Sequence, residues 1–455
     1  MQLPPPLQAG EGRGEGRRSR RAMIEANLAL LLVFAAFLVL GAPVAVALAL
    51  GSIAGIWLGL DAAAMGTVGT NTYNGIAKYP LIAIPLFVLT GTIFERAGVA
   101  ERLVGFAQAV VGPRRGGLAL VAILVALVMG GMAGSGPADA AAVATVMIPS
   151  MARAGYPRPF AASVIAAASS TAILIPPSIA LIVYAILVPG TDLRALFAGG
   201  LVPGLLAGLA LAVPTLWLSR RHDFGRLEGD TRPPFWRSFR RAIPGLLAPV
   251  IILGGLRSGL FTPTETAAVA AVYGFLVGLL IHRSMGLQDL YRVLADSALT
   301  SAVIMLIIAL AGIFAWAGST LGAFDLAARA ILGLSTSPSV VLLLVMAAIL
   351  VAGMVLDGVS IFLITLPLLI PIAQAMGWNL VWFGVLMSMN IAIGQFTPPV
   401  AVNLMVTTRI AGVGLETTFA WTAWMVLAMT LALLAVILMP ELVLWLPRAL
   451  GYRVG

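Results

Sequence analysis

The chain has 455 residues, of which 60% are hydrophobic and only 10% are charged, and its mean hydropathy is +1.04. Soluble domains carry about a quarter charged residues, so this composition excludes a soluble protein and indicates a helical membrane protein with many spans. The long uninterrupted apolar runs also exclude a barrel of alternating strands. The net charge is +9, and nearly all of the positive residues are arginines. In a membrane protein this excess indicates topology rather than nucleic-acid binding. The absence of cysteine excludes disulfides, thiolate metal sites and cysteine catalysis.

Residues 1–22 are rich in proline, glycine and arginine, and Met23 is followed at once by an apolar run. They could be the charged flank of a signal anchor, or an extension upstream of a true start at Met23. We favour a non-native or disordered leader, because the topology below places this end outside, where its arginines are unfavourable.

Ten apolar segments are long enough, or nearly so, to span a bilayer. They cover residues 24–40, 44–60, 79–95, 160–188, 196–218, 242–257, 264–281, 298–317, 380–408 and 418–446. Two more, 117–152 and 339–375, are interrupted at Gly134–Gly136 and Asp357–Gly358. Each could be two spans joined by a tight turn. We expect re-entrant hairpins, because arms of about 17 residues are short for a span.

One signature occurs in both halves of the chain at an offset of 222 residues. The residues that recur are Gly131, Met132, Gly136, Ile148, Pro149 and Gly155, which return as Gly353, Met354, Gly358, Ile370, Pro371 and Gly377. The same offset carries Pro176-Pro177 onto Pro398-Pro399. Paired segments broken by glycine and proline in corresponding halves indicate the binding site of a transporter.

Orientation follows from the arginines in short loops. Loop 219–241 carries seven of them and should be cytoplasmic. Counting back, the first hairpin opens from the cytoplasmic side. Five predicted spans separate the two hairpins, so the second opens from outside, the halves are inverted repeats, and both termini lie outside.

The first hairpin tip (133–139) and the mid-span segment 168–178 offer carbonyl and hydroxyl oxygens freed from regular helix by glycine and proline. At membrane depth such backbone is tolerated only if it is buried or lines a cavity. Oxygens without fixed charge suit Na⁺ better than a divalent ion. A simple helix–helix turn and a plain proline kink are the alternatives. The first predicted Na⁺ site comprises Gly134, Ser135, Gly136, Ser169, Ser170 and Ile175.

The counterpart lies in segment 390–399, beside the second hairpin tip. Asp357 in that tip is an acidic group at membrane depth, where it could ligate an ion, carry a proton or cap the following helix. The second predicted Na⁺ site comprises Asp357, Gly358, Ser360, Gly394 and Thr397. No cofactor and no metal other than Na⁺ is expected.

Two other features favour structural roles. Thr262-Pro263-Thr264-Glu265 has the pattern of a helix capping box. His222 and His282 lie in loops, which offers nothing for a histidine metal site or a Ser/His pair. An intramembrane hydrolase would then rest on Gly-Ser-Gly at 134–136 alone, so we expect no enzyme.

Together these residues resemble the large membrane subunit of TRAP (tripartite ATP-independent periplasmic) transporters, the DctM-like proteins. The motifs that carry the resemblance are Gly134-Ser-Gly-Pro-Ala-Asp139 with Ile148-Pro149, Ile175-Pro-Pro-Ser178, Phe261-Thr-Pro-Thr-Glu265, Asp357 and Thr397-Pro-Pro-Val400 with Asn403. The resemblance covers about residues 23–446. It departs at Ser169-Ser-Thr-Ala172, where the family is glycine-rich, and at Ala401, where glycine is usual.

The resemblance implies the fold of the ion transporter superfamily: an all-α membrane protein with inverted repeats, two hairpins and two broken helices, moving as an elevator against a scaffold. The implied division is scaffold at 23–116, core repeat 1 at 117–188, scaffold and connecting arm at 189–338, core repeat 2 at 339–408, and a C-terminal helix at 409–455.

The resemblance further implies Na⁺-driven import of a small organic acid, of the C4-dicarboxylate, sialic acid or keto/hydroxy acid class, across the bacterial inner membrane. The implied partners are a soluble periplasmic DctP-like binding protein and a separate small four-helix DctQ-like membrane subunit; no nucleic acid is expected. No arginine lies in the predicted core, so helix N-termini and polar side chains would bind the substrate. The side chains predicted for this role are Ser135, Thr171, Ser178, Asn390 and Asn403. A stand-alone Na⁺/dicarboxylate carrier of the same superfamily is the alternative.

The inverted topology is testable in this cysteine-free chain. Cysteines introduced at Arg153 and Asp325 should react from opposite faces of the membrane, because an odd number of spans separates the hairpins. We expect an impermeant maleimide to label the cysteine at 325 in spheroplasts and the cysteine at 153 only after permeabilisation. Labelling of both from one side would refute the inverted repeat.

Overall fold

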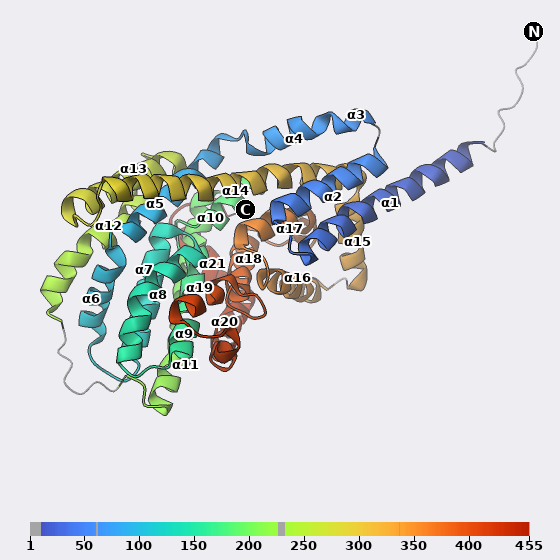
Figure 1. Ribbon diagram of the computed structural model, residues 1–455. Coiled ribbons are helices and arrows are strands. Elements are labelled where there is room, and N and C mark those ends of the chain that lie inside the picture. The colour runs from blue at the N-terminus through green and yellow to red at the C-terminus, as the bar shows by residue number, and fades with distance from the viewer. Residues whose placement is uncertain (1–10, 61, 226–232, 336, 455) are drawn as a thin grey trace, which may run out of the picture. The chain divides into compact units, whose positions relative to one another are not determined.

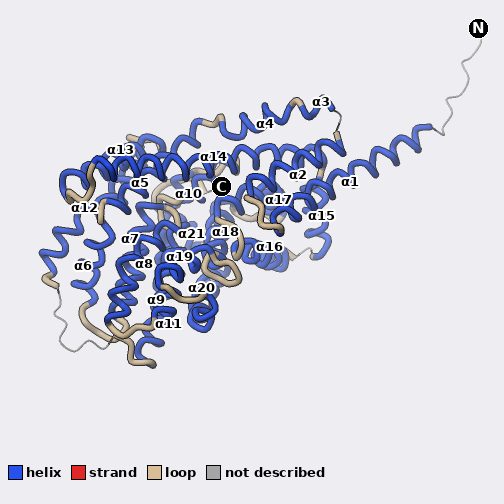
Figure 2. The backbone as a smooth tube through the Cα atoms, viewed as in Figure 1, coloured by secondary structure: helices blue, strands red, loops and turns tan. Residues whose placement is uncertain are grey.

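The computed structural model describes residues 11–60, 62–225, 233–335 and 337–454, and the regular structure in these ranges is entirely helical (Figures 1 and 2). Within them, seven helical segments are long and apolar enough to cross a bilayer: 79–96, 193–221, 235–258, 263–281, 287–321, 358–375 and 415–438. Of the predicted leader 1–22, residues 1–10 lie outside the described ranges, and 11–22 form the start of a helix.

The chain divides into two compact units. The first contains residues 1–78, 303–336 and 363–371. Its helices are α1 (Glu11–Val39), α2 (Val44–Gly59), α3 (Ala62–Met65), α4 (Thr67–Ile76), α15 (Ala323–Leu334) and the C-terminal part of α14 (Leu287–Leu321). Glycine lets α1 and α2 pack closely, since a Cβ at Gly51 or Gly55 would lie 2.8 Å from an atom of Leu30.

The second unit contains residues 79–302, 337–362 and 372–455. Its elements before the second hairpin are η1 (Tyr79–Ile82), α5 (Ala83–Arg96), α6 (Val99–Val111), α7 (Gly117–Ala133), α8 (Gly136–Arg153), α9 (Arg158–Ser170), η2 (Thr171–Ile173), α10 (Ile179–Leu187), α11 (Leu193–Arg221), α12 (Phe235–Ser258), α13 (Pro263–Leu276), η3 (Val277–Ile281) and the N-terminal part of α14. They are followed by α16 (Pro338–Gly353), parts of α17 (Gly358–Ala375), α18 (Leu380–Gly394), α19 (Val402–Ala411), η4 (Leu415–Thr418), α20 (Phe419–Leu438) and α21 (Glu441–Ala449).

The sequence repeat reappears in the helix boundaries. Helix α17 begins and ends 222 residues after α8, and α16, α18 and α19 follow α7, α9 and α10 at nearly the same offset. In both halves the first hairpin arm crosses the end of the next broken helix at small residues. A Cβ at Gly394 would lie 2.5 Å from the carbonyl carbon of Gly353, and one at Gly130 would lie 2.8 Å from Cα of Ala172. Because no side chain fits there, these crossings bring backbone directly against backbone.

Two expectations have clear outcomes here. The capping box is confirmed: Glu265 N–H donates to Thr262 Oγ1 over 3.3 Å, and Thr262 N–H donates to Glu265 Oε2 over 2.7 Å. The single span expected at 418–446 is wrong, because α20 ends at Leu438 and α21 begins at Glu441. Pro440 disfavours helical backbone at the residue before it and lacks the N–H that would continue the ladder.

Candidate functional site

The turn between α7 and α8 forms the first hairpin tip. Gly134 adopts a left-handed conformation (φ +61°) and Ser135 is extended, so α8 restarts at Gly136. A Cβ at Gly134 would overlap the carbonyl oxygen of Pro177, so only glycine lets the tip approach this closely. The tip therefore lies against the break of the first interrupted helix. The Ser135 side chain is half-buried there.

The first broken helix is α9, η2 and α10, interrupted around the Pro176-Pro177 pair. Most of its hydroxyl groups form hydrogen bonds with nearby backbone groups. Ser178 Oγ donates to the Ile173 carbonyl over 2.6 Å, and it caps α10 by accepting a hydrogen bond from Leu181 N–H. Thr171 and Ser170 donate to the carbonyls of Ala168 and Ala167. Ser169, by contrast, is buried and its hydroxyl has no partner. Of the hydroxyls predicted in this segment, that of Ser169 is left for a ligand.

The second hairpin tip lies between α16 and α17, and its acidic residue caps the returning helix. Asp357 Oδ1 accepts hydrogen bonds from Val359 N–H (3.0 Å) and Ser360 N–H (3.1 Å), while Oδ2 accepts from the Ser360 hydroxyl. Of the three roles weighed for Asp357, the capping contact is thus directly visible. A capping carboxylate keeps further lone pairs, so this geometry leaves room for an ion.

The second broken helix is α18 and α19, joined by residues 395–401. Asn403 N–H donates to the Gln395 carbonyl (3.0 Å), and Thr397 Oγ1 donates to the Ile393 carbonyl (2.6 Å). Ala401 N–H donates to the Met354 carbonyl over 2.9 Å, which ties this break to the second hairpin tip. Most of the backbone freed by the break is thereby satisfied within the protein.

The two tips and the two breaks meet at a pair of buried carboxamides. A Cβ at Gly136, the first residue of α8, would lie 2.7 Å from Gln395 Oε1 and 2.9 Å from Asn403 Nδ2. One at Gly358, the first residue of α17, would contact Ile173 of the other broken helix and lie 3.7 Å from Gln395 Nε2. Gln395 therefore lies between the N-termini of α8 and α17.

Both carboxamides are buried, and each has an oxygen that accepts no hydrogen bond. Gln395 is 3% exposed and Asn403 0%, and neither Gln395 Oε1 nor Asn403 Oδ1 has a hydrogen-bond partner. Asn403 Nδ2 makes only a long contact of 3.5 Å to the Ala166 carbonyl. Buried polar groups are nearly always paired, so unpaired ones here mark a place for a ligand. The positive ends of two helices nearby favour an anionic group such as a carboxylate.

Sequence reasoning placed Asn403 in the site but missed Gln395. The signal was available, since Gln395 is a polar residue in an apolar span two positions before Thr397-Pro398. Asn390, predicted to bind substrate, lies elsewhere: its Nδ2 donates to the Met346 carbonyl over 2.5 Å. Met346 is seven residues before the end of α16, about 10 Å along the helix. Asn390 thus fastens α18 to α16 at a distance from the tips.

A second residue absent from the predicted site is Asp139 on α8. Its side chain is completely buried, and neither carboxyl oxygen has a hydrogen-bond partner. It lies beside Gly130 of α7, where a Cβ would be 3.4 Å from Asp139 Oδ2. Among the buried side chains of the described residues it is the only carboxylic acid, and none of these buried side chains is a lysine, arginine or histidine. Within those residues no three His, Cys, Asp or Glu side chains gather as a metal site would require.

The sequence matches a known family of proteins. Residues 31–442 match the family model described as the DctM component of the tripartite ATP-independent periplasmic transporter. The chain is 40% identical over 374 residues to the C4-dicarboxylate TRAP transporter large permease protein DctM of Pseudomonas aeruginosa, covering 82% of this chain and 87% of that one. It is 34% identical over 380 residues to the sialic acid permease SiaM of Vibrio cholerae, covering 83% and 89%.

A third relative is longer. The isethionate permease DctMQ of Oleidesulfovibrio alaskensis is 35% identical over 387 residues, which are 84% of this chain but 60% of that protein. Among solved structures, the YdaH transporter of Alcanivorax borkumensis has a TM-score of 0.61 at 16% identity, covering 87% of this chain and 91% of that one. MtrF of Neisseria gonorrhoeae has a TM-score of 0.56 at 15% identity, covering 91% and 96%. At such low identity these two likenesses concern the fold alone.

The unusual backbone at the second break gives a stability prediction. Ala401 has φ +54°, a left-handed conformation that disfavours any residue with a Cβ by about 1–2 kcal/mol. We expect Ala401→Gly to stabilise the protein by about 0.5–1 kcal/mol after the greater chain entropy of glycine is offset. The matched control is Ala423→Gly in the helical backbone of α20, which should destabilise by about 0.5–1 kcal/mol. Thermal unfolding in detergent measures both, and a lower midpoint for Ala401→Gly would contradict the assigned conformation.

Proposed function

Because the chain belongs to the family of DctM components of tripartite ATP-independent periplasmic transporters, we propose that it is the large permease subunit of a Na⁺-coupled, binding-protein-dependent importer of a small organic acid. The family consists of transporter permeases and not of enzymes, and its members are multi-pass membrane proteins. We place this one in the bacterial inner membrane.

The observation that carries the proposal is the buried carboxamide pair between two helix N-termini. Gln395 and Asn403 combine amide donors with unpaired oxygens, and the α8 and α17 termini add positive dipole ends. The amide N–H groups and the helix termini suit a carboxylate without an arginine, and the unpaired oxygens suit a hydroxyl donor or a cation. The relatives above are named for C4-dicarboxylates, isethionate and sialic acid, and this chain would take a ligand of the same anionic class. Ser135, at the first tip, would add a hydroxyl.

Coupling to Na⁺ is assigned to the oxygens that flank this pair. At the first site the backbone of Gly134 and Gly136, the hydroxyls of Ser135 and Ser169 and the backbone near Ile175 supply uncharged ligands. At the second, Asp357 would supply a carboxylate, Gly394 lies against Gly353 before the same tip, and Thr397 would add an oxygen from the second break. A mixture of carbonyls, hydroxyls and at most one carboxylate favours a weakly held monovalent ion.

Movement would take the form of an elevator. The two helical hairpins and two broken helices would form the moving core, arranged as inverted repeats, and the remaining helices the scaffold. The likeness to YdaH and MtrF supports this fold class. Glycine-mediated backbone contacts within each repeat support a core that moves as one piece.

Two partners are proposed. The relative from Oleidesulfovibrio alaskensis is named DctMQ and extends well beyond the matched region, so it supports a Q-type membrane component working beside the M-type permease. We assign this chain a separate small membrane subunit of that type and a soluble periplasmic binding protein that delivers substrate.

Reconstituted vesicles test the proposal. With the small subunit present and a loaded binding protein outside, an inward Na⁺ gradient should drive uptake, and replacing Na⁺ by choline should abolish it. Uptake that follows a pH gradient without Na⁺ would overturn Na⁺ coupling. Uptake that needs no binding protein would instead indicate a stand-alone carrier.

An Asp357→Asn variant separates ion binding by Asp357 from its role as a helix cap. Asn caps helices about as well as Asp, so Asp357→Asn should retain the fold while removing the charge. We expect the Na⁺ concentration for half-maximal uptake to rise by about tenfold, equivalent to about 1.4 kcal/mol of ion binding. The matched control is Asp192→Asn, which changes another aspartate N-cap, on α11, and should leave the titration unchanged. An unaltered Na⁺ titration for Asp357→Asn would remove Asp357 from the ion site.

A further inference from the structure

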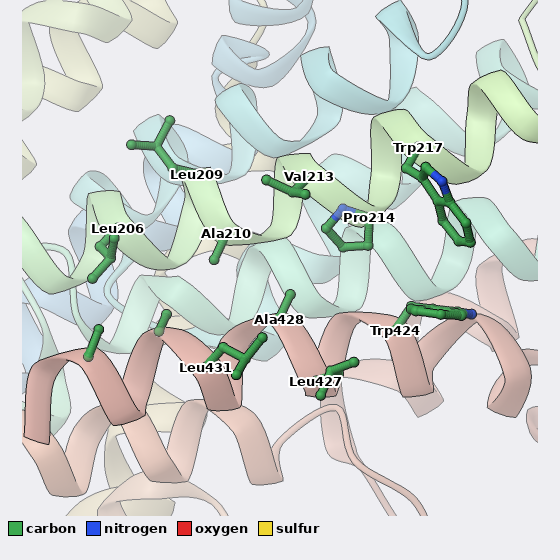
Figure 3. A pocket seen from close by; sticks show the side chains of 12 residues that line it. Leu206, Leu209, Ala210, Val213, Pro214, Trp217, Trp424, Leu427, Ala428 and Leu431 are labelled. Atoms are coloured by element: carbon green, nitrogen blue, oxygen red, sulfur yellow. The ribbon is translucent and has the colours of Figure 1, made fainter.

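A groove runs along the outer surface between α11 and α20 (Figure 3). These two helices are repeat-related and pack against each other, and both belong to candidate membrane spans. The groove has a volume of about 610 Å³ and is lined by leucine, alanine, valine, proline and tryptophan side chains. Most of its large apolar side chains are well exposed, with Leu209 at 68% and Leu431 at 58%. A surface of this kind holds hydrocarbon.

One end of the groove has a different chemistry. Trp217 of α11 and Trp424 of α20 lie together there (Figure 3). Their ring centroids are 5.1 Å apart. The Arg221 guanidinium lies 5.1 Å from the Trp217 ring centroid, and Arg220 is exposed beside it. Neither arginine makes an ion pair with another described residue. Tryptophan and arginine in this order are typical of the boundary between lipid tails and headgroups.

The length of the groove matches one leaflet. From Leu206 to Trp217, helix α11 advances by eleven residues, about 16 Å, which is roughly half of a 30 Å hydrocarbon core. A transmembrane helix of a partner would run the whole core, whereas an acyl chain ends within one leaflet. Arg220 and Arg221, at the tryptophan end, supply positive charge where a lipid headgroup would lie.

We propose that this groove is a binding site for an anionic phospholipid of the surrounding bilayer. One acyl chain lies along Leu209, Ala210, Ala428 and Leu431, the two tryptophans bracket the glycerol region, and Arg220 and Arg221 bind the phosphate headgroup. In the orientation predicted from the arginine-rich loop, the lipid belongs to the cytoplasmic leaflet. The site occupies a surface remote in sequence from both hairpin tips and adds a lipid ligand to the permease.

Native mass spectrometry of the full-length protein, purified in detergent and mixed with equal amounts of phosphatidylglycerol and phosphatidylcholine, tests this site. The wild type should retain phosphatidylglycerol preferentially, and Arg221→Gln should lower the preference by about fivefold. Ala428→Phe fills the groove and should lower retention of both lipids. The controls are Arg257→Gln, an exposed arginine of α12, and Val272→Phe, a 59% exposed position on α13, which should change neither.

Arg221 is exposed, so its variant should fold even if Ala428→Phe does not. Equal retention of the two lipids by the wild type would overturn the proposal, as would an unchanged preference in Arg221→Gln. A cysteine at Leu431 gives an independent check in the complex. Its cross-linking to the small membrane subunit would show that a protein helix covers the groove, which also refutes a lipid site.

Discussion

The structure depends on one constraint: backbone groups released from a helix inside a bilayer must find partners within the protein. The chain releases them at four places, two hairpin tips and two helix breaks. Ser178 and Thr397 donate their hydroxyls to free carbonyls, Asp357 caps α17, and Ala401 N–H reaches across to Met354. Three of these contacts lie within one interruption, and the bond from Ala401 joins the second break to the second tip. Glycines at the tips let them approach the breaks closely.

Some buried polar groups near these interruptions have no hydrogen-bond partner, and the proposed site is built on them. Gln395, Asn403, Ser169 and Asp139 are buried and retain oxygens without partners. Leaving such groups unpaired in a closed core is unfavourable by about 1–3 kcal/mol each, which a bound ion or substrate can recover. The same groups that make the empty core less stable thus give a ligand its binding energy. Weak, exchangeable binding of this kind suits a carrier that must release its substrate.

Sequence reasoning recovered the features that depend on local chemistry. Glycine and proline located the turn at Gly134 and the interruption before Gly358, because few other residues allow such backbone. The short helices α6 and α15 were not predicted, because they are too short to look like spans. The role of Gln395 was also missed, since only packing shows that it lies between α8 and α17. Packing alone also shows the surroundings of Asn390: it was predicted to bind substrate, and its Nδ2 donates to the Met346 carbonyl.

If the first hairpin tip borders the transport site, bound substrate should protect it from a thiol reagent. In this cysteine-free chain, Ser135→Cys places one thiol at the half-buried tip that precedes α8. Thr145→Cys places a control thiol at an exposed position within α8. The measurement is the rate of labelling by a small thiol reagent in vesicles, with and without Na⁺ and loaded binding protein. We expect Na⁺ and substrate to slow labelling at position 135 and to leave the labelling rate at position 145 unchanged. Equal labelling rates at 135 under all conditions would contradict it.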